Sequence, residues 1–437
     1  MTSPASVPAR GSYRQVLRNR EFLCLIVAHT ASTLGTSIAI VALAVLVFER
    51  TSSPLLSSLT FTLGFAPFLL GGALSPRFER VPARRLMISC DLFQGVGYAV
   101  MALPGLPVAA VLAVLALDSV ASPIFAGTRA ALLPDLLGDG DGFVLGRSVL
   151  RVISQSSQIV GLALATALLL LMPAHAVLLL VAATSACSAL VIRLGLRAHA
   201  PVHADGATTL AASGGLRAVF TTSRRRLLVL GWAVPMAAVA PEALAVPYVT
   251  KLGLSAASAG LLLWAAPTGA VIGELLTVRL LGPAGRVRAV LPLAAATLIM
   301  PIGFIAQPGL IVAATLLLLS CAGSGYTLGL DQLLLAATPP PLRRRVLSVS
   351  NSGLMFWQGL GFGLAGAAAE LVPIRIAIPT ISVIGLIALS RLASGLRQPG
   401  SRHRRGDRRL RGRDPGDRHP VGGARHVVDP RAVKERD

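Results

Sequence analysis

The sequence predicts an all-α membrane protein in which twelve transmembrane helices form two pseudo-symmetric bundles of six. Three observations lead to this prediction. The composition is strongly apolar, with a mean hydropathy of +0.72 and 54% hydrophobic residues, well above the apolar content of soluble domains. The apolar residues are gathered into stretches long enough to cross a bilayer. Finally, the second half of the chain repeats features of the first half.

The internal repeat is seen when the sequence is compared with itself at an offset of 200 residues. One unchanged offset brings similar residues into register at several places spread along both halves. A duplicated membrane bundle predicts this pattern. The aligned pairs are Ala66-Pro67 with Ala266-Pro267, Phe48 with Tyr248, Gly35 with Pro235, and Ser148, Gln158 and Gly161 with Ser348, Gln358 and Gly361.

Six apolar stretches in the first half are predicted to be transmembrane helices. A helix needs about 20 apolar residues to cross the hydrocarbon layer, and each stretch lies between charged or Pro- and Gly-rich breaks. We assign residues 22–195 to a first six-helix bundle, preceded by a cytoplasmic segment at 1–21. The predicted spans are residues 22–48, 55–75, 86–103, 106–125, 144–171 and 174–195.

The second half gives six further spans by the same criteria, and they define a bundle over residues 227–396. A basic cytoplasmic loop at 196–226 joins the two bundles. The tail at 397–437 is rich in Arg, Gly, Pro and Asp, so we expect it to be disordered and cytoplasmic. The predicted spans are residues 227–250, 255–281, 289–306, 309–337, 346–371 and 373–395.

The arginines predict the orientation of these spans, because short cytoplasmic loops collect Arg and Lys. With the N-terminus inside, only Arg50, Lys251 and Arg375 lie on the opposite side. Both termini are therefore expected in the cytoplasm of a multi-pass protein of the bacterial plasma membrane. The arginines on the inner side include Arg10, Arg14, Arg18, Arg20, Arg84, Arg85, Arg193, Arg197, Arg279, Arg286, Arg288, Arg391 and those at 224–226 and 343–345.

Charge and cysteine content exclude several other functions. The net charge of +21 does not indicate nucleic acid binding, because membrane orientation and the basic tail explain the basic residues. The only lysines, Lys251 and Lys434, do not end a Gly-rich phosphate loop. Each cysteine lies alone in a different span, which favours a small buried residue over a metal ligand or a disulfide. We expect no enzyme activity, no cofactor and no metal.

The twelve spans, the two halves and the inner termini resemble the major facilitator superfamily. The turn from Gly72 to Arg80 is similar to that family's Gly-x-Leu-Ala-Asp-Arg signature, whose charges latch the halves together. Pro76 stands at the acidic position and can supply neither charge nor hydrogen-bond donor. The resemblance implies a cytoplasmic gating turn that involves Gly72, Arg77, Arg80, Asp91 and Arg129.

Two further stretches resemble the branch of this superfamily that contains macrolide-type and siderophore-type exporters. They are residues 91–94 and 125–135. Of the antiporter signature in the fifth span, only Gly161 survives. The resemblance implies proton-driven efflux of a drug or secondary metabolite, although the antiporter signature itself does not support this.

Ionisable residues inside the spans are candidates for proton coupling, because a charge at the bilayer centre is costly and needs a reason. Glu242 lies beyond the middle of the seventh span between Pro241 and Pro247, where an irregular helix can face a cavity and the carboxylate can take up a proton. The alternative is a carboxylate that reaches the outer interface beside Lys251. The other candidates, nearer the cytoplasmic face, are Asp118, Asp331, Glu274 and His29, for which structural contacts are an equal alternative.

Strongly polar side chains near mid-depth in the fifth and eleventh spans are candidates for a substrate cavity. These residues either bind substrate between the halves or join neighbouring helices by hydrogen bonds. The set comprises Gln155, Gln158, Asn351, Trp357 and Gln358.

These observations together predict a monomeric secondary transporter that works by alternating access. Its expected partners are the lipid bilayer, protons and a small, moderately hydrophobic substrate, with efflux as the leading direction. Uptake of a small nutrient is an alternative within the same class. A membrane scaffold or receptor of the same fold that does not transport is an alternative from another class, because the gating and antiporter signatures are incomplete.

Overall fold

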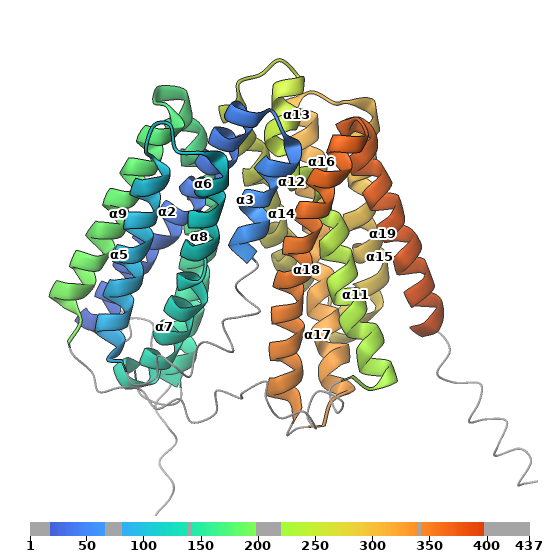
Figure 1. Ribbon diagram of the computed structural model, residues 1–437. Coiled ribbons are helices and arrows are strands. Elements are labelled where there is room, and N and C mark those ends of the chain that lie inside the picture. Colours follow the sequence, from blue (N-terminus) through green and yellow to red (C-terminus); the bar gives the residue numbers. More distant parts are fainter. Residues whose placement is uncertain (1–17, 66–80, 138–140, 198–219, 340–341, 397–437) are drawn as a thin grey trace, which may run out of the picture. The chain divides into compact units, whose positions relative to one another are not determined.

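The computed structural model confirms an all-helical membrane fold (Figure 1). Each of the twelve predicted spans overlaps one or more helices of the described part of the chain, and residues 66–75 of the second span lie outside it. Eight helical segments there are long and apolar enough to cross a bilayer, and shorter apolar helices accompany them. The structure describes residues 18–65, 81–137, 141–197, 220–339 and 342–396.

The first half is organised around its first helix, α2. Residues 41–47 of α2 are buried on every side, because α2 packs against α3, α8 and α9. Asn19 caps this helix by accepting hydrogen bonds from the backbone N–H groups of Glu21 and Phe22, which satisfies two of its free donors. The helices are α2 (Arg20–Thr51), α3 (Pro54–Phe65), α5 (Ala83–Met101), α6 (Val108–Asp118), α7 (Ala121–Leu137), α8 (Asp141–Leu171) and α9 (Ala174–Gly195).

The predicted span 106–125 differs from the structure, because two helices replace one. α6 ends at Asp118, and α7 begins at Ala121 and continues to Leu137. Pro123 lies in the first turn of α7, where a residue without a backbone N–H is tolerated, whereas inside a continuous helix it would remove a hydrogen bond. The chain therefore restarts its helix just before this proline.

The second half repeats the order of the first. α5 and α15 begin at residues 83 and 283, and α9 and α19 begin at residues 174 and 374, so the offset seen in the sequence also relates the helices. The elements are α11 (Thr222–Ala238), α12 (Ala240–Ala243), α13 (Ala245–Lys251), η1 (Ala256–Ser258), α14 (Ala259–Leu280), α15 (Pro283–Ile299), η2 (Met300–Ala306), α16 (Leu310–Ala322), η3 (Gly323–Gly325), α17 (Tyr326–Ala336), α18 (Arg343–Leu371) and α19 (Ile374–Leu396).

The seventh span is irregular, as its prolines predict. The helix is interrupted at Val239 and again at Leu244, which leaves α12 as a single short turn between α11 and α13. Pro241 and Pro247 lack the N–H groups that a continuous helix would use. Backbone groups at these interruptions are satisfied locally, for example by the hydrogen bond from Ala243 N–H to the Val239 carbonyl.

Two glycines bring α14 and α16 into direct backbone contact. A Cβ atom added to Gly269 would overlap the carbonyl oxygen of Leu318, and one added to Gly273 would overlap that of Ala322. Small residues allow membrane helices to approach in this way. The close packing explains why this part of α14 carries no larger side chain toward α16.

We name the two ends of the helices after the ends of α2. The Arg20 end of the helices is the end at which α2 begins, and the Thr51 end is the end at which α2 finishes. The residues that join the halves belong to one compact unit, Met1–Ala393.

Candidate functional site

The two halves pack against each other through α3 and α18 toward the Thr51 end. The ring of Phe362 on α18 stacks on Phe61 and Phe65 of α3, at centroid distances of 5.1 Å and 5.6 Å. Nearer the Thr51 end, a Cβ atom added to Gly366 would overlap the side chain of Ser58. We call this tightly packed contact the α3–α18 seam.

Glu370 fastens the seam at its Thr51 end. Its Oε1 accepts a hydrogen bond from the Ser53 hydroxyl at 2.5 Å and another from the Leu55 backbone N–H at 3.2 Å. The first turn of α3 contains no acidic residue of its own. A carboxylate from the other half therefore satisfies the free Leu55 N–H group at the start of α3 and complements the helix dipole.

A second contact between the halves joins α8 to α14. A Cβ atom added to Gly260 of α14 would overlap the Thr166 hydroxyl and lie 2.9 Å from the Leu162 carbonyl oxygen. The face of α8 that carries Leu162 and Thr166 is therefore the face that meets the second half.

The same face of α8 continues toward the Arg20 end as a line of polar residues. Arg151, Gln155 and Gln158 follow one another at intervals of four and three residues, which places them on one side of a helix together with Leu162. Arg151 Nη2 lies 3.8 Å from Glu274 Oε2 on α14. Asp331 of α17 interacts electrostatically with both Arg151 and Glu274, so charges from both halves meet here.

The corresponding face of α18 also carries amides. Asn351, Gln358 and Phe362 lie on one side of this helix by their spacing, and Phe362 shows that this side faces α3. Asn351 is exposed and Gln358 is half-buried. Trp357 lies one position away, where it packs edge-on against Phe356 with ring centroids 5.8 Å apart.

The four predicted amides share one property. Gln155, Gln158, Asn351 and Gln358 make no side-chain hydrogen bond with any other residue that the structure describes, although each lies within a helix of membrane-spanning length. Amides that face hydrocarbon without a partner are costly. Gln155 and Gln158 lie on the side of α8 that meets α14, and Asn351 and Gln358 lie on the side of α18 that meets α3, so the four amides follow the two contacts between the halves.

Glu242 lies in the short turn α12, which contacts α3 of the first half as well as α14 and α18. The residue as a whole is half-buried, and the Cys321 thiol donates to its Oε1 at 4.0 Å. No ion pair links Glu242 to Lys251 or to another base within the described ranges. The structure thus places Glu242 beside the contact between the halves.

His29 and Arg129 belong to a polar network inside the first half. His29 is buried, and its Nε2 lies 2.7 Å from the Ser154 hydroxyl. The Arg129 guanidinium also contacts the imidazole and lies 5.9 Å from the centre of the Phe125 ring. These contacts join α2, α7 and α8.

Two buried carboxylates lie within the first half, away from α14 and α18. Asp91, which the resemblance assigns to the gating turn, lies inside α5, where the Ser188 hydroxyl donates to its Oδ2 at 2.6 Å. Asp118 ends α6 and abuts Gly97 of α5. One oxygen of each carboxylate has no hydrogen-bond partner in the described part of the chain.

The structure does not describe three of the predicted gating residues, since Gly72, Arg77 and Arg80 lie outside the described ranges. It adds two residues that the sequence analysis did not select. Arg151 could have been found from its helical spacing to Gln155. Glu370 could not, because its partner Ser53 lies 317 residues away in the sequence.

Neither a metal site nor a disulfide is present among the residues that the structure describes. No group of three or more His, Cys, Asp or Glu side chains there could hold a metal ion. The four cysteines are free thiols, of which Cys24 and Cys90 are buried.

Comparison with solved structures identifies the fold. A nucleoside transporter, NupG, superimposes with a TM-score of 0.71 at 12% sequence identity, over 86% of this chain and 98% of the transporter. A bacterial homologue of the iron transporter ferroportin, in an inward-facing state, gives a TM-score of 0.62 at 17% identity, over 88% and 100% of the two chains. A bacterial homologue of the lysosomal transporter Spinster, inward-facing and occupied, gives 0.64 at 14% identity, over 89% and 98%.

These structures are transporters of the major facilitator type, and at such low identity they show the fold alone. No protein-family model matches the chain, and no curated protein matches it. The chain therefore has the all-α fold of major facilitator transporters.

Proposed function

We propose that this protein is a secondary transporter that moves a small, moderately hydrophobic molecule by alternating access. The observation that supports this most directly is the unpartnered polar face between the halves. Gln155 and Gln158 on α8 and Asn351 and Gln358 on α18 offer hydrogen-bonding groups that the described part of the protein leaves unused. A substrate held there would contact both pseudo-symmetric halves, as alternating access requires.

The contacts between the halves suggest which side of the membrane the site faces. The α3–α18 seam and the contact between Gly260 and Thr166 both lie toward the Thr51 end. The arginine distribution favours the Arg20 end as cytoplasmic. With this orientation, in the bacterial plasma membrane with both termini inside, the tightly packed contacts between the halves lie on the outer side, which supports a site that opens to the cytoplasm.

Two rigid halves, residues 22–195 and 227–396, would then rock about this site while the central loop at 196–226 joins them. The four amides of the polar face are uncharged, which fits a moderately hydrophobic substrate rather than a polyanion. Export of a drug or secondary metabolite by a monomer is the function that best fits these features. It is also the function implied by the resemblance to macrolide-type and siderophore-type exporters.

Proton coupling is assigned to Glu242. This carboxylate sits at a break in the seventh span, next to the contact between the halves, and has no basic partner among the described residues. A carboxylate without a cation can exchange a proton with an aqueous cavity as the halves rock. Glu274 and Asp331 are instead held near Arg151, which suits a role in joining the halves.

The proposal is tested in everted membrane vesicles whose lumen has been acidified. A panel of lipophilic cations and amphiphiles is added, and proton release from the lumen is followed with a pH-sensitive dye. We expect the wild-type protein to release protons with at least one compound. Glu242→Gln should abolish that release and retain compound binding, because the isosteric amide cannot carry the proton.

Glu49→Gln serves as the matched control, because Glu49 is exposed at the Thr51 end and away from the polar face. Proton release that persists in Glu242→Gln would exclude Glu242 as the carrier. Absence of release with every compound would favour the non-transporting scaffold, and proton uptake coupled to substrate entry would favour nutrient import.

A further inference from the structure

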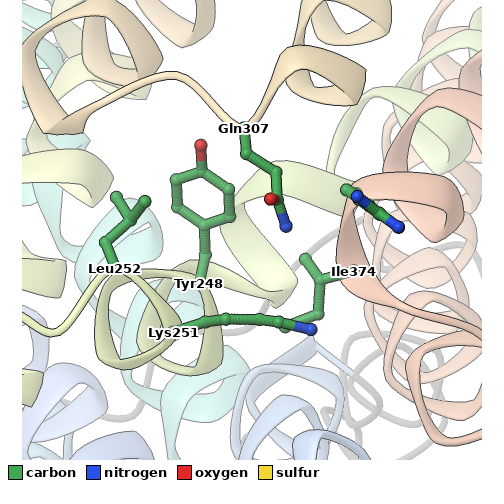
Figure 2. Close-up of a pocket in the computed structure, with 6 residues that line it drawn as sticks. Tyr248, Lys251, Leu252, Gln307 and Ile374 are labelled. Atoms are coloured by element: carbon green, nitrogen blue, oxygen red, sulfur yellow. The ribbon is translucent and has the colours of Figure 1, made fainter.

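A small pocket lies at the Thr51 end of the second half, apart from the polar face between the halves (Figure 2). Its volume is about 120 Å³. Three elements meet around it: the end of α13, the turn that follows η2 and the start of α19. The lining residues are Tyr248, Lys251, Leu252, Gln307, Ile374 and Arg375.

The charge in this pocket is unbalanced. Lys251 and Arg375 both line it, and none of the lining residues is acidic. Neither side chain forms an ion pair with a carboxylate that the structure describes. The acid nearest to Arg375 in sequence, Glu370, accepts hydrogen bonds from the Ser53 hydroxyl and the Leu55 N–H. Two like charges brought together without a counter-charge repel each other, so this arrangement favours a bound anion.

These two cations are also unusual for their location. In the predicted orientation, Arg50, Lys251 and Arg375 are the only basic residues on the side of the Thr51 end, and two of the three line the same pocket. The rule that places basic residues in cytoplasmic loops gives no reason for this pairing. Binding of an anion in the pocket would explain why the two cations lie together.

The start of α19 adds further positive potential. Ile376 N–H and Ala377 N–H both bond to the Pro373 carbonyl, so the preceding N–H groups of Ile374 and Arg375 have no partner within the helix. No acidic residue stands in this first turn. A basic residue in the first turn opposes the helix dipole, a conflict that an anion at this position would relieve.

The other lining residues define the shape of the pocket. Gln307 has a left-handed backbone with φ of 49°, and Figure 2 shows its amide pointing toward the space between Tyr248 and Ile374. The Tyr248 hydroxyl is held by the Pro308 carbonyl at 2.6 Å. The Tyr248 ring, Leu252 and Ile374 supply the apolar part of the lining, and Figure 2 shows Ile374 beside the end of the Lys251 side chain.

We infer that this pocket binds a phosphate group, held between the Lys251 ammonium and the Arg375 guanidinium with the Gln307 amide as a third donor. A phosphate carries the negative charge and the several acceptor oxygens that such donors recognise. The volume accommodates one such group. The phosphate comes either from the headgroup of an anionic phospholipid or from free phosphate in solution. The site is independent of the proposed transport function.

The test uses the full-length protein purified in an uncharged detergent, with isothermal titration calorimetry as the measurement. The probes are dihexanoyl phosphatidylglycerol, inorganic phosphate and, as the zwitterionic comparison, dihexanoyl phosphatidylcholine. We expect saturable binding of a phosphate-bearing anion. Lys251→Gln and Arg375→Gln should each weaken it about tenfold, because each removes one charge-assisted hydrogen bond. Lys251→Arg keeps the charge and should largely restore binding.

Arg50→Gln is the matched control, because it removes the same charge at the same end. Arg50 donates to the Leu106 carbonyl at 2.8 Å and does not line the pocket, so binding should be unchanged. Binding of phosphatidylglycerol without inorganic phosphate assigns the ligand to lipid, and binding of both assigns it to the phosphate group itself. No saturable binding of either probe, or equal binding by wild type and both pocket variants, would overturn the inference.

Discussion

At Gly273, a single added carbon atom is enough to disturb the fold. A Cβ atom there would overlap the Ala322 carbonyl oxygen, which cannot turn away as a flexible side chain could. We expect Gly273→Ala to lower the stability of the folded protein by roughly 1–3 kcal/mol, the usual cost of overpacking. Unfolding by titration with SDS in mixed micelles measures the change.

Gly285→Ala provides the comparison for this substitution. Gly285 lies in the first turn of α15, and an added Cβ would make only ordinary contact, 3.4 Å from Leu281. Alanine is the better helix former, so this variant should be as stable as the wild type or more so. Equal stability of both alanine variants would show that α14 and α16 separate easily at Gly273.

The sequence identifies the polar residues of the spans but does not show which of them bond to neighbouring helices and which have no partner. Hydropathy marks His29 and Gln158 equally as polar residues in apolar segments. Only the packed structure shows that His29 bonds to Ser154 and Arg129, whereas Gln158 has no partner within the described ranges. The difference depends on the rotation of each helix about its axis, which neighbouring helices determine.

At the scale of the helix, α3 depends on a cap supplied from the other half. Glu370→Ala would remove the hydrogen bonds from the Ser53 hydroxyl and the Leu55 N–H, and would leave that N–H without its carboxylate. We expect the α3–α18 seam to open more often at the Thr51 end. Ser58, fully buried in the seam, then becomes accessible, so Ser58→Cys should react several-fold faster with a membrane-impermeant thiol reagent.

The labelling experiment requires a background in which the four native cysteines are replaced. Glu370→Gln retains an acceptor oxygen without the charge and should give an intermediate rate, because charge-assisted hydrogen bonds are stronger than neutral ones. If Ser58→Cys is labelled at the same rate with Glu370 present and in the Glu370→Ala variant, the cap does not hold the α3–α18 seam closed.

Helix positions were largely predictable, because span length and proline placement depend on the local sequence. The interruptions at Val239 and Leu244 follow from Pro241 and Pro247. The separation of α6 from α7 was missed, because hydropathy continues across Ser119 and Val120 while the backbone does not. The cap of α3 was also missed, since no local pattern connects it to Glu370.

At the scale of the whole molecule, the ion pair between Arg151 and Glu274 links the two halves near the Arg20 end. The side chains are 77% and 37% exposed, so the pair should contribute less than about 1 kcal/mol to stability. Its expected effect is on the relative position of the halves. Arg151→Glu places a third negative charge beside Glu274 and Asp331 and should drive α8 away from α14.

The measurement is the distance between spin labels on the Arg20 ends of α8 and α14. We expect a longer distance in Arg151→Glu and a return toward the wild-type distance when Glu274→Arg is added, because the swap restores opposite charges. Arg288→Glu, an exposed position on α15, controls for the change in net charge. An unchanged distance in Arg151→Glu would show that the pair follows the motion of the halves without affecting it.

The duplicated architecture was visible in the sequence, because the offset of 200 residues also separates the starts of α5 and α15 and of α9 and α19. How the halves meet was not visible. The contacts of Phe362 with Phe61 and of Gly260 with Thr166 join residues that no shared pattern connects. They depend on shape complementarity between surfaces, which a linear hydropathy pattern does not encode.

The direct backbone contact between α14 and α16 has a practical consequence for experiments that follow motion. Helices that touch through Gly269 and Gly273 have no layer of side chains between them that could rearrange and let one helix slide past the other. We expect α14 and α16 to move together as one rigid pair, so a fluorophore on either helix reports the displacement of both. To record conformational change, one dye of a pair is therefore best placed on α14 or α16 and the other on α8. A pair with one dye on α14 and the other on α16 should keep a constant distance and serves as the reference.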